Sequence, residues 1–309
     1  MAMTKEKLID LIATAKGRFS EDMKARTGNV DAIVTDDTCA NGVYNPFMLG
    51  GIGAGRKWVG PRVYARLKSY GVRFVCEKFE KTVEISSDEL TDNPAVDGAK
   101  IGQKLAESAM LTELKETLGV LKNNAVGFDA DPLFGEHAYY DQNTDGSIKL
   151  DADGNPVVTA TFSNDMGGTG DSWYGACKNP IIRVTQVGED YVVVMKGGSA
   201  ESSEYTFDTD NLAWGWKARK IFKPGLPFYT IRSKQPLSAE SWQAMKDRSA
   251  TFVNDAGELV DNRITHIVVK RGTAAAANAK KLFTQQLLAN GESNIYATEG
   301  VTILEVDHI

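Results

Sequence analysis

The chain has 309 residues, of which 42% are hydrophobic and 25% charged, a composition typical of a packed globular protein. Its 35 Lys and Arg are outnumbered by 41 Asp and Glu, and the resulting net charge of −6 argues against tight binding of nucleic acid over the whole surface. This net charge does not exclude a protein that encloses DNA without binding it tightly. Charged residues near the amino terminus and the lack of a long apolar run predict neither a signal peptide nor a membrane span.

Three cysteines, Cys39, Cys76 and Cys177, are widely spaced and form no CxxC pair. We therefore expect reduced thiols in a protein made in the cytoplasm, rather than disulfides or metal ligands.

The first fifty residues predict a helix followed by an extended arm. Apolar residues recur at helical spacing between Leu8 and Phe19, with Thr4 as a plausible cap, whereas residues 27–45 are polar and rich in turn formers. The glycine-rich run at 49–55 indicates a flexible hinge, because no Lys-Ser or Lys-Thr closes it as in a phosphate-binding loop.

Alternating polar and apolar residues from Val75 to Ile85 predict a strand with one solvated face. Together with residues 63–70 it is expected to form a projecting two-stranded element. Because a lone hairpin is only marginally stable in water, such a projection needs a partner surface. We expect neither the arm nor this hairpin to cover its apolar side chains within its own chain.

A long helix is predicted from Asn93, as the cap before Pro94, to about Asn123. Gly98, Gly102 and Gly119 each lower its helix propensity by about 1 kcal/mol, which indicates close approach of another backbone.

The remainder alternates strands and helices. Residues 128–230 have a β pattern, and Leu237 and Trp242 flank Ser238 as a hydrophobic staple around a helix cap. A buried strand at 264–269, a helix at 274–288 and a final strand at 301–306 follow. This order predicts an α+β fold.

Candidate chemistry is sparse. Glu136 and His137 form the one acid–base pair considered for catalysis, and a hydrolase using them is the alternative to a non-enzymatic protein. No GxSxG, HExxH or Walker motif occurs, so we expect no enzyme and no cofactor. His266, in the apolar strand, is expected to be structural.

The segment from Asp141 to Asp153 resembles the start of a calcium loop, with Asp141, Asn143 and Asp145 as candidate ligands. Ala152 replaces the acidic residue required at position twelve. Because Asp-Gly pairs are strong hairpin signals, we favour turns here, with a weak ion site as the alternative.

Several short motifs, in order along nearly the whole chain, resemble those of the Mu-like phage major head subunit, the gpT family. They are the segments 56–62 (RKWVGPR), 79–86 (FEKTVEIS), 131–137 (DPLFGEH) and 265–269 (THIVV), with the helix that follows. The Asp/Gly-rich stretch 141–155 and the pair Lys270-Arg271, where the family often has proline, depart from the pattern.

This resemblance implies a Hong Kong 97-like capsid fold, with an arm at 1–50, an extended hairpin loop at 51–90, a peripheral domain at 91–235 with its spine helix at 93–123, and an axial domain at 236–309. It implies a virion protein, made in the bacterial cytoplasm, that self-assembles as pentamers and hexamers into an icosahedral shell around double-stranded DNA, with scaffolding and portal proteins as partners. An encapsulin-like nanocompartment shell is the alternative within the same fold. We expect subunit contacts at Arg56, Lys57, Trp58, Arg62 and Phe79, since aromatic and arginine side chains are typical interface anchors.

Overall fold

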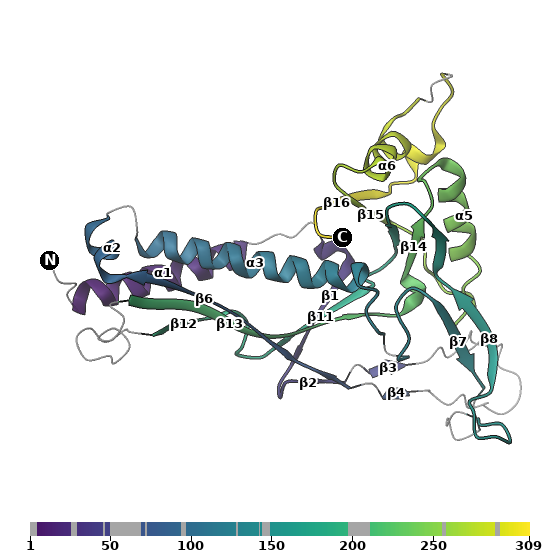
Figure 1. Ribbon diagram of the computed structural model, residues 1–309. Helices are drawn as coiled ribbons and strands as arrows, with labels where there is room; N and C mark the ends of the chain where they lie inside the picture. Colours follow the sequence, from purple (N-terminus) through teal and green to yellow (C-terminus); the bar gives the residue numbers. More distant parts are fainter. Residues whose placement is uncertain are drawn as a thin grey trace, which may run out of the picture.

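The computed structural model contains two larger sheets, each covered by helices. Figure 1 shows a long flat part with two helices lying along it and a second part standing at one end. The mixture of helices and mainly antiparallel sheets confirms the predicted α+β class. The structure describes residues 5–25, 30–45, 47–49, 69–71, 73–93, 97–127, 129–141, 143, 149–196, 211–254, 258–287 and 291–309.

The flat part is built on what we term the long sheet. Its strands are β1 (Val34–Cys39), β11 (Ile181–Gln186), β13 (Asn211–Pro224), β12 (Val192–Lys196) and β6 (Glu77–Ser86). The central strand β13 pairs antiparallel with β6 over ten residues, while β11 and β12 pair with successive stretches of it. A short 3-10 helix, η1 (Asp31–Ile33), leads into β1.

Two helices cover the long sheet, α1 (Lys5–Ala25) and α3 (Gly98–Lys122). Phe19 of α1 and Leu105 of α3 are buried with Trp214 and Trp216 of β13 in one apolar cluster. The expectation that the amino-terminal segment leaves its apolar side chains uncovered is therefore wrong for α1. It is also wrong for the extended arm around β1, which pairs in parallel with β11.

Glycines bring the two helices into backbone contact. A Cβ atom at Gly98 would lie 2.5 Å from the carbonyl oxygen of Leu11, and one at Gly102 would lie 2.3 Å from that of Ala15. The predicted close approach is confirmed at these two positions. At Gly119 it is wrong, because the nearest atom to such a Cβ would be a side-chain nitrogen at 3.5 Å.

The cap of α3 lies four residues later than predicted. Asp97 is the N-cap, and its side chain accepts a hydrogen bond from the backbone N–H of Lys100 at 2.8 Å. Asn93 instead ends α2 (Ser87–Asp92), because its backbone N–H donates to the carbonyl of Glu89. The predicted end of the long helix at Asn123 is confirmed.

Strand β6 has the predicted alternation only in part: Phe79 and Ile85 are half-buried, but Val83, which was expected on the same face, is 37% exposed. Its partner, however, is β13, so the expected pairing with residues 63–70 is wrong where the structure describes that segment. Below the sheet, β2 (Val43–Tyr44) pairs with β5 (Phe74–Val75), and β3 (Phe47–Leu49) pairs with β4 (Ser69–Gly71).

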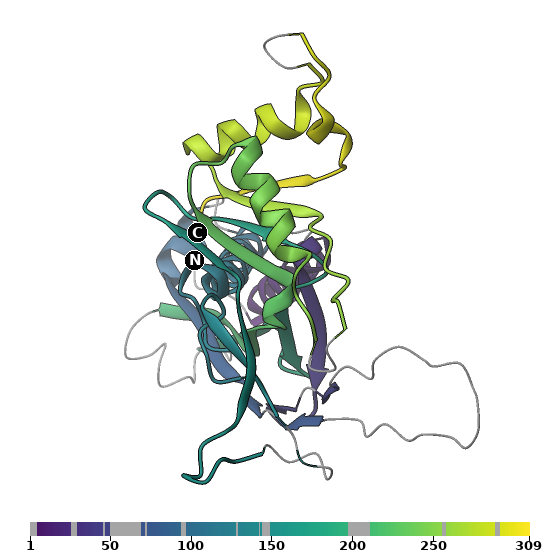
Figure 2. The same ribbon diagram turned by 90° about the vertical axis from the view of Figure 1, so that its right-hand side faces the viewer.

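The second sheet, termed the end sheet, has the order β16 (Thr302–Val306), β15 (His266–Lys270), β10 (Trp173–Ala176), β14 (Thr230–Lys234) and β9 (Asp165–Gly168). Figure 2, seen from this side, shows α5 (Ala239–Ser249) in front of the sheet and α6 (Ala274–Thr284) above it. Two 3-10 turns, η3 (Pro227–Tyr229) and η4 (Ile295–Thr298), complete this part.

The predicted staple and cap at α5 are confirmed. Ser238 and Ser241 form a reciprocal capping box, and Leu237 and Trp242 are buried in the same apolar cluster. The helix predicted at 274–288 is shorter than expected. It ends at Thr284, and Leu287 beyond it is 61% exposed.

A hairpin of β7 (Glu136–Tyr140) and β8 (Val158–Ser163) extends from the junction of the two sheets (Figure 1). The predicted Asp153-Gly154 turn is confirmed, because Asp151 accepts backbone hydrogen bonds from Asp153 and Asn155 and Gly154 has a φ of 84°. Asp145 lies outside the described residues.

Candidate functional site

The predicted subunit-contact residues fall in two places. Arg56, Lys57, Trp58 and Arg62 lie outside the described residues. Phe79 is half-buried on β6, and its ring makes an edge-on contact with Phe222 of the same chain, with centroids 5.7 Å apart. Phe79 therefore packs in part against its own subunit, and its contact with a neighbouring subunit stays a prediction, as for the other four residues.

A buried ion cluster fixes α3 onto the long sheet. Glu113 of α3 is 2.9 Å from the guanidinium of Arg183 on β11 and 3.0 Å from the ammonium of Lys220 on β13. Lys220 has only 1% of its surface exposed, so its charge requires this partner. Asp190 adds a second carboxylate to Lys220 at 2.9 Å.

Arg183 extends the same cluster to the amino-terminal strand. It donates to Asp36 of β1 at 2.7 Å and lies 3.2 Å from Asp31. Burial disfavours its charge, but the hydrogen bonds to Asp36 and the charge of Glu113 prevail and raise the pKa of Arg183. One cluster thus ties α3, β1, β11 and β13 together.

Sequence reasoning did not find this cluster. Glu113 stands in a helix among Lys and Glu residues, and Arg183 and Lys220 lie in strands with mixed neighbours. A charged residue on the inward-facing side of a strand is the available signal. Arg183 and Glu113, however, lie 70 positions apart along the chain, so no local sequence pattern links the two residues.

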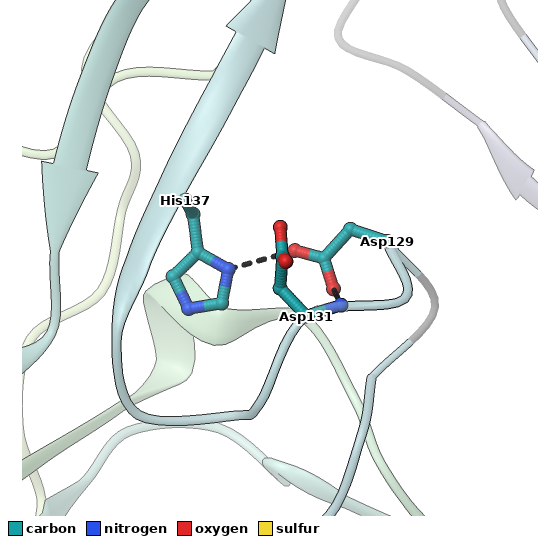
Figure 3. A group of neighbouring side chains, drawn as sticks. All are labelled: Asp129, Asp131 and His137. Carbon is teal, nitrogen blue, oxygen red and sulfur yellow. Dashed lines mark hydrogen bonds and ion pairs between the residues drawn. The ribbon is translucent and has the colours of Figure 1, made fainter.

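Figure 3 shows the second polar cluster, in which His137 on β7 faces Asp129 and Asp131 on the preceding loop. Nδ1 of His137 is 2.7 Å from a carboxylate oxygen of Asp129, and Nε2 is 3.1 Å from the carbonyl oxygen of Leu133. Since a carbonyl only accepts, Nε2 carries a hydrogen.

The electrostatics favour an imidazolium in this cluster. Burial disfavours the charged ring, yet the hydrogen bond to Asp129 and the charges of Asp129 and Asp131 outweigh it and raise the pKa of His137. The ligand atoms of the three residues lie within 4.8 Å of one another, the spacing of a metal site. Both ring nitrogens of His137 already contact protein groups, Nδ1 with Asp129 and Nε2 with Leu133.

The geometry counts against the Glu136–His137 hydrolase. The two residues are neighbours on a strand and point to opposite faces, and Glu136 is exposed whereas only 2% of His137 is. Both ring nitrogens of His137 have partners inside the protein. A general base needs access to its substrate, which this ring lacks.

The calcium candidate gains no support among the described residues. Asp141 pairs with Lys149 at 2.9 Å, and Asn143 also has interactions within the structure. Among the described residues, the group with metal-ligand spacing consists of Asp129, Asp131 and His137, and Asp141 is not part of it. His266 is a satisfied group, as predicted, with Nδ1 2.9 Å from the hydroxyl of Thr265.

All three cysteines are free, as expected. The structure nevertheless brings two of them together, because Sγ of Cys39 and Sγ of Cys76 are 3.3 Å apart in a buried position. Along the described chain, no helix is long and apolar enough to span a membrane.

Comparisons with known proteins agree on one group. The chain is 23% identical over 279 residues to the major capsid protein of Escherichia phage Mu, covering 89% of this chain and 87% of that protein. The described fold is similar to that of the procapsid of bacteriophage JBD30, with a TM-score of 0.74, 21% identity and coverage of 99% and 100% of the two chains. For the bacteriophage JBD30 capsid the TM-score is 0.68, with 16% identity and 91% coverage of each chain.

These likenesses show the Hong Kong 97-like capsid fold. The model of one family, described as the Mu-like prophage major head subunit gpT, matches residues 8–309. The chain, a phage major capsid subunit, therefore belongs to the Mu-like gpT major head subunit family.

Proposed function

We propose that copies of this chain assemble, as pentamers and hexamers, into an icosahedral head shell that encloses double-stranded DNA. The observation that carries this proposal is the combination of family membership with a fold that leaves large apolar side chains such as Leu287 and Ile295 exposed. An encapsulin-like nanocompartment is the alternative use of this fold, and the family match favours the phage head.

The segment at 50–68 is our candidate for the contact with a neighbouring subunit. Its two ends are held by the strand pairs β2–β5 and β3–β4. Within it, Trp58 is flanked by Arg56, Lys57 and Arg62, a combination of aromatic and cationic groups that suits an interface anchor. We propose that this loop lies on the next subunit.

The end sheet offers a second contact surface. Leu287, just beyond α6, is 61% exposed, and Ile295, at the start of η4, is 67% exposed. Large exposed apolar side chains favour burial against another copy, because burial removes apolar area from water. We propose that this end, the axial domain of residues 236–309, packs around the symmetry axes.

The net charge of the chain is also compatible with a shell that encloses DNA. A net charge of −6 suits a wall that surrounds DNA without binding its sequence, because attachment to phosphates requires clustered cations. Scaffolding and portal proteins are the further partners we propose, with synthesis in the host cytoplasm and a final place in the virion.

The decisive experiment is electron microscopy of purified protein expressed with and without a scaffolding protein. We expect rings or closed shells from the unaltered chain and only folded, unassembled subunits from Trp58→Ala. Trp58→Phe is the matched control, because it keeps an aromatic anchor and should retain part of the shell yield.

Circular dichroism separates folding from assembly in these variants. Closed shells from Trp58→Ala at the unaltered yield would contradict the loop contact. A correctly folded unaltered chain that forms no ring or shell under either condition would contradict the shell function.

A further inference from the structure

The thiol pair is the feature that the shell function leaves unexplained. Cys39 ends β1, and Cys76 lies between β5 and β6, 37 residues later. Each is 6% exposed, and their sulfur atoms are 3.3 Å apart. A disulfide has a sulfur–sulfur bond of about 2 Å, so the two atoms need to approach by about 1 Å for bonding.

Backbone hydrogen bonds hold both cysteines in place. The N–H of Cys76 donates to the carbonyl of Gly42 at 2.8 Å, and the carbonyl of Cys39 accepts from Val187 at 2.9 Å. Apolar side chains pack around the pair, chiefly Phe74, Ile182 and Val184. Bond formation is therefore a matter of side-chain rotation within a fixed frame.

The surroundings also disfavour reaction of the pair while the fold is closed. Burial and the hydrogen bond to Cys39 raise the pKa of Cys76 to about 12, which disfavours its reactive thiolate form. The positive charge of Arg219 acts in the opposite direction and favours the thiolate of Cys76. Reaction of the pair with an oxidant therefore requires local opening of its surroundings.

We propose that Cys39 and Cys76 are a covalent modification site, which closes to an intramolecular disulfide after the protein leaves the reducing cytoplasm. Disulfides form and persist at virion surfaces and are rare inside cells. Only this timing rests on the proposed function; the bond itself depends on the chain alone. The bond would join the two ends of the stretch that contains the proposed contact segment at 50–68.

The oxidant is a low-molecular-weight disulfide such as oxidised glutathione. The thiolate of one cysteine attacks one of its sulfurs, the reagent's S–S bond breaks, and one glutathione leaves. The thiolate of the other cysteine then attacks this mixed disulfide and releases the second glutathione. The two cysteines lose two electrons and two protons, and the reagent becomes two thiols.

The test uses the full-length purified chain. It is incubated with oxidised glutathione, unfolded, alkylated with iodoacetamide and digested for mass spectrometry. We expect one alkylated cysteine, Cys177, and a linked pair of peptides containing Cys39 and Cys76 that separates on reduction. The melting temperature should rise by roughly 5–10 °C relative to the reduced chain, because the link restricts the unfolded state.

Cys177→Ser is the matched control, since Cys177 is also buried but its thiol donates a hydrogen bond to the carbonyl of Phe228, and this variant should form the same linked peptides as the unaltered chain. Cys39→Ser and, if it misfolds, Cys39→Ala should give neither linked peptides nor a higher melting temperature. The proposal is overturned if Cys39 and Cys76 carry separate glutathiones, or remain alkylatable, after prolonged oxidation. The linked peptides form within a single chain, so they can be detected whether or not the protein assembles into shells.

Discussion

The long sheet and the end sheet are stabilised by different means. Along the long sheet, α1 and α3 touch through backbone at Gly102, and an ion cluster at Glu113 is buried beneath α3. The end sheet is filled by interlocking side chains, with Trp242 and Phe283 in edge-on contact at 4.8 Å. Close backbone contacts and buried charges cannot rearrange easily around a substituted residue, whereas apolar side chains can change rotamer to accommodate it. We therefore expect the long sheet to be the less tolerant region.

The largest expected effect comes from removing the charge at the centre of the long-sheet cluster. Glu113→Gln leaves Arg183 and Lys220 without their shared carboxylate, and should lower the free energy of unfolding by about 3–5 kcal/mol. Urea unfolding of unassembled protein, followed by tryptophan fluorescence, measures this loss.

Glu107→Gln is the control, because Glu107 lies on the same helix but pairs with Lys104 at the surface. It should leave the unfolding curve unchanged. If Glu113→Gln and Glu107→Gln give the same urea unfolding curve, the buried cluster stabilises the protein no more than a surface ion pair does, and it is not what makes the long sheet less tolerant.

A pair of glycine substitutions compares the two regions directly. In Gly102→Ala the new methyl group meets the backbone carbonyl of Ala15, and we expect a loss of about 2 kcal/mol. In Gly175→Ala on β10 the nearest atom, at 2.5 Å, is the sulfur of Met245, a flexible side chain, so a loss of about 1 kcal/mol is expected.

Gly119→Ala serves as the control for the helix, because space is available there and alanine has the higher helix propensity. It should stabilise the protein by up to about 1 kcal/mol. A greater loss at Gly175 than at Gly102 would reverse the proposed order of tolerance.

The smallest expected effect is a pH dependence at the junction between the regions. Because the pKa of His137 is raised in the folded protein, its ion pair with Asp129 contributes fully below the unfolded value of 6.5. This contribution is lost as the pH rises from there through the folded pKa.

The free energy of unfolding of the unaltered chain, measured at several pH values between about pH 5 and about pH 9, should decline as the pH rises. In His137→Asn this part of the decline should disappear. A decline of the same size in both chains would assign it to other groups.

Local pattern was sufficient wherever neighbouring residues determine the conformation. The helix through Phe19 and the cap at Ser238 depend on side chains within a few residues, and each was predicted. The helix start at Asp97 was missed because Asn93-Pro94 offers an equally good local signal, and only the geometry of the preceding α2 excludes it.

Family motifs in order along the chain were enough to indicate the capsid fold, and composition was enough to indicate a packed core. Only the tertiary structure decided that β6 pairs with β13, that Glu113 meets Arg183 and Lys220, and that Cys39 lies against Cys76. The physical reason is separation along the chain. Such contacts join residues tens of positions apart or more, and they arise from the packing of whole elements, which no short window of sequence encodes.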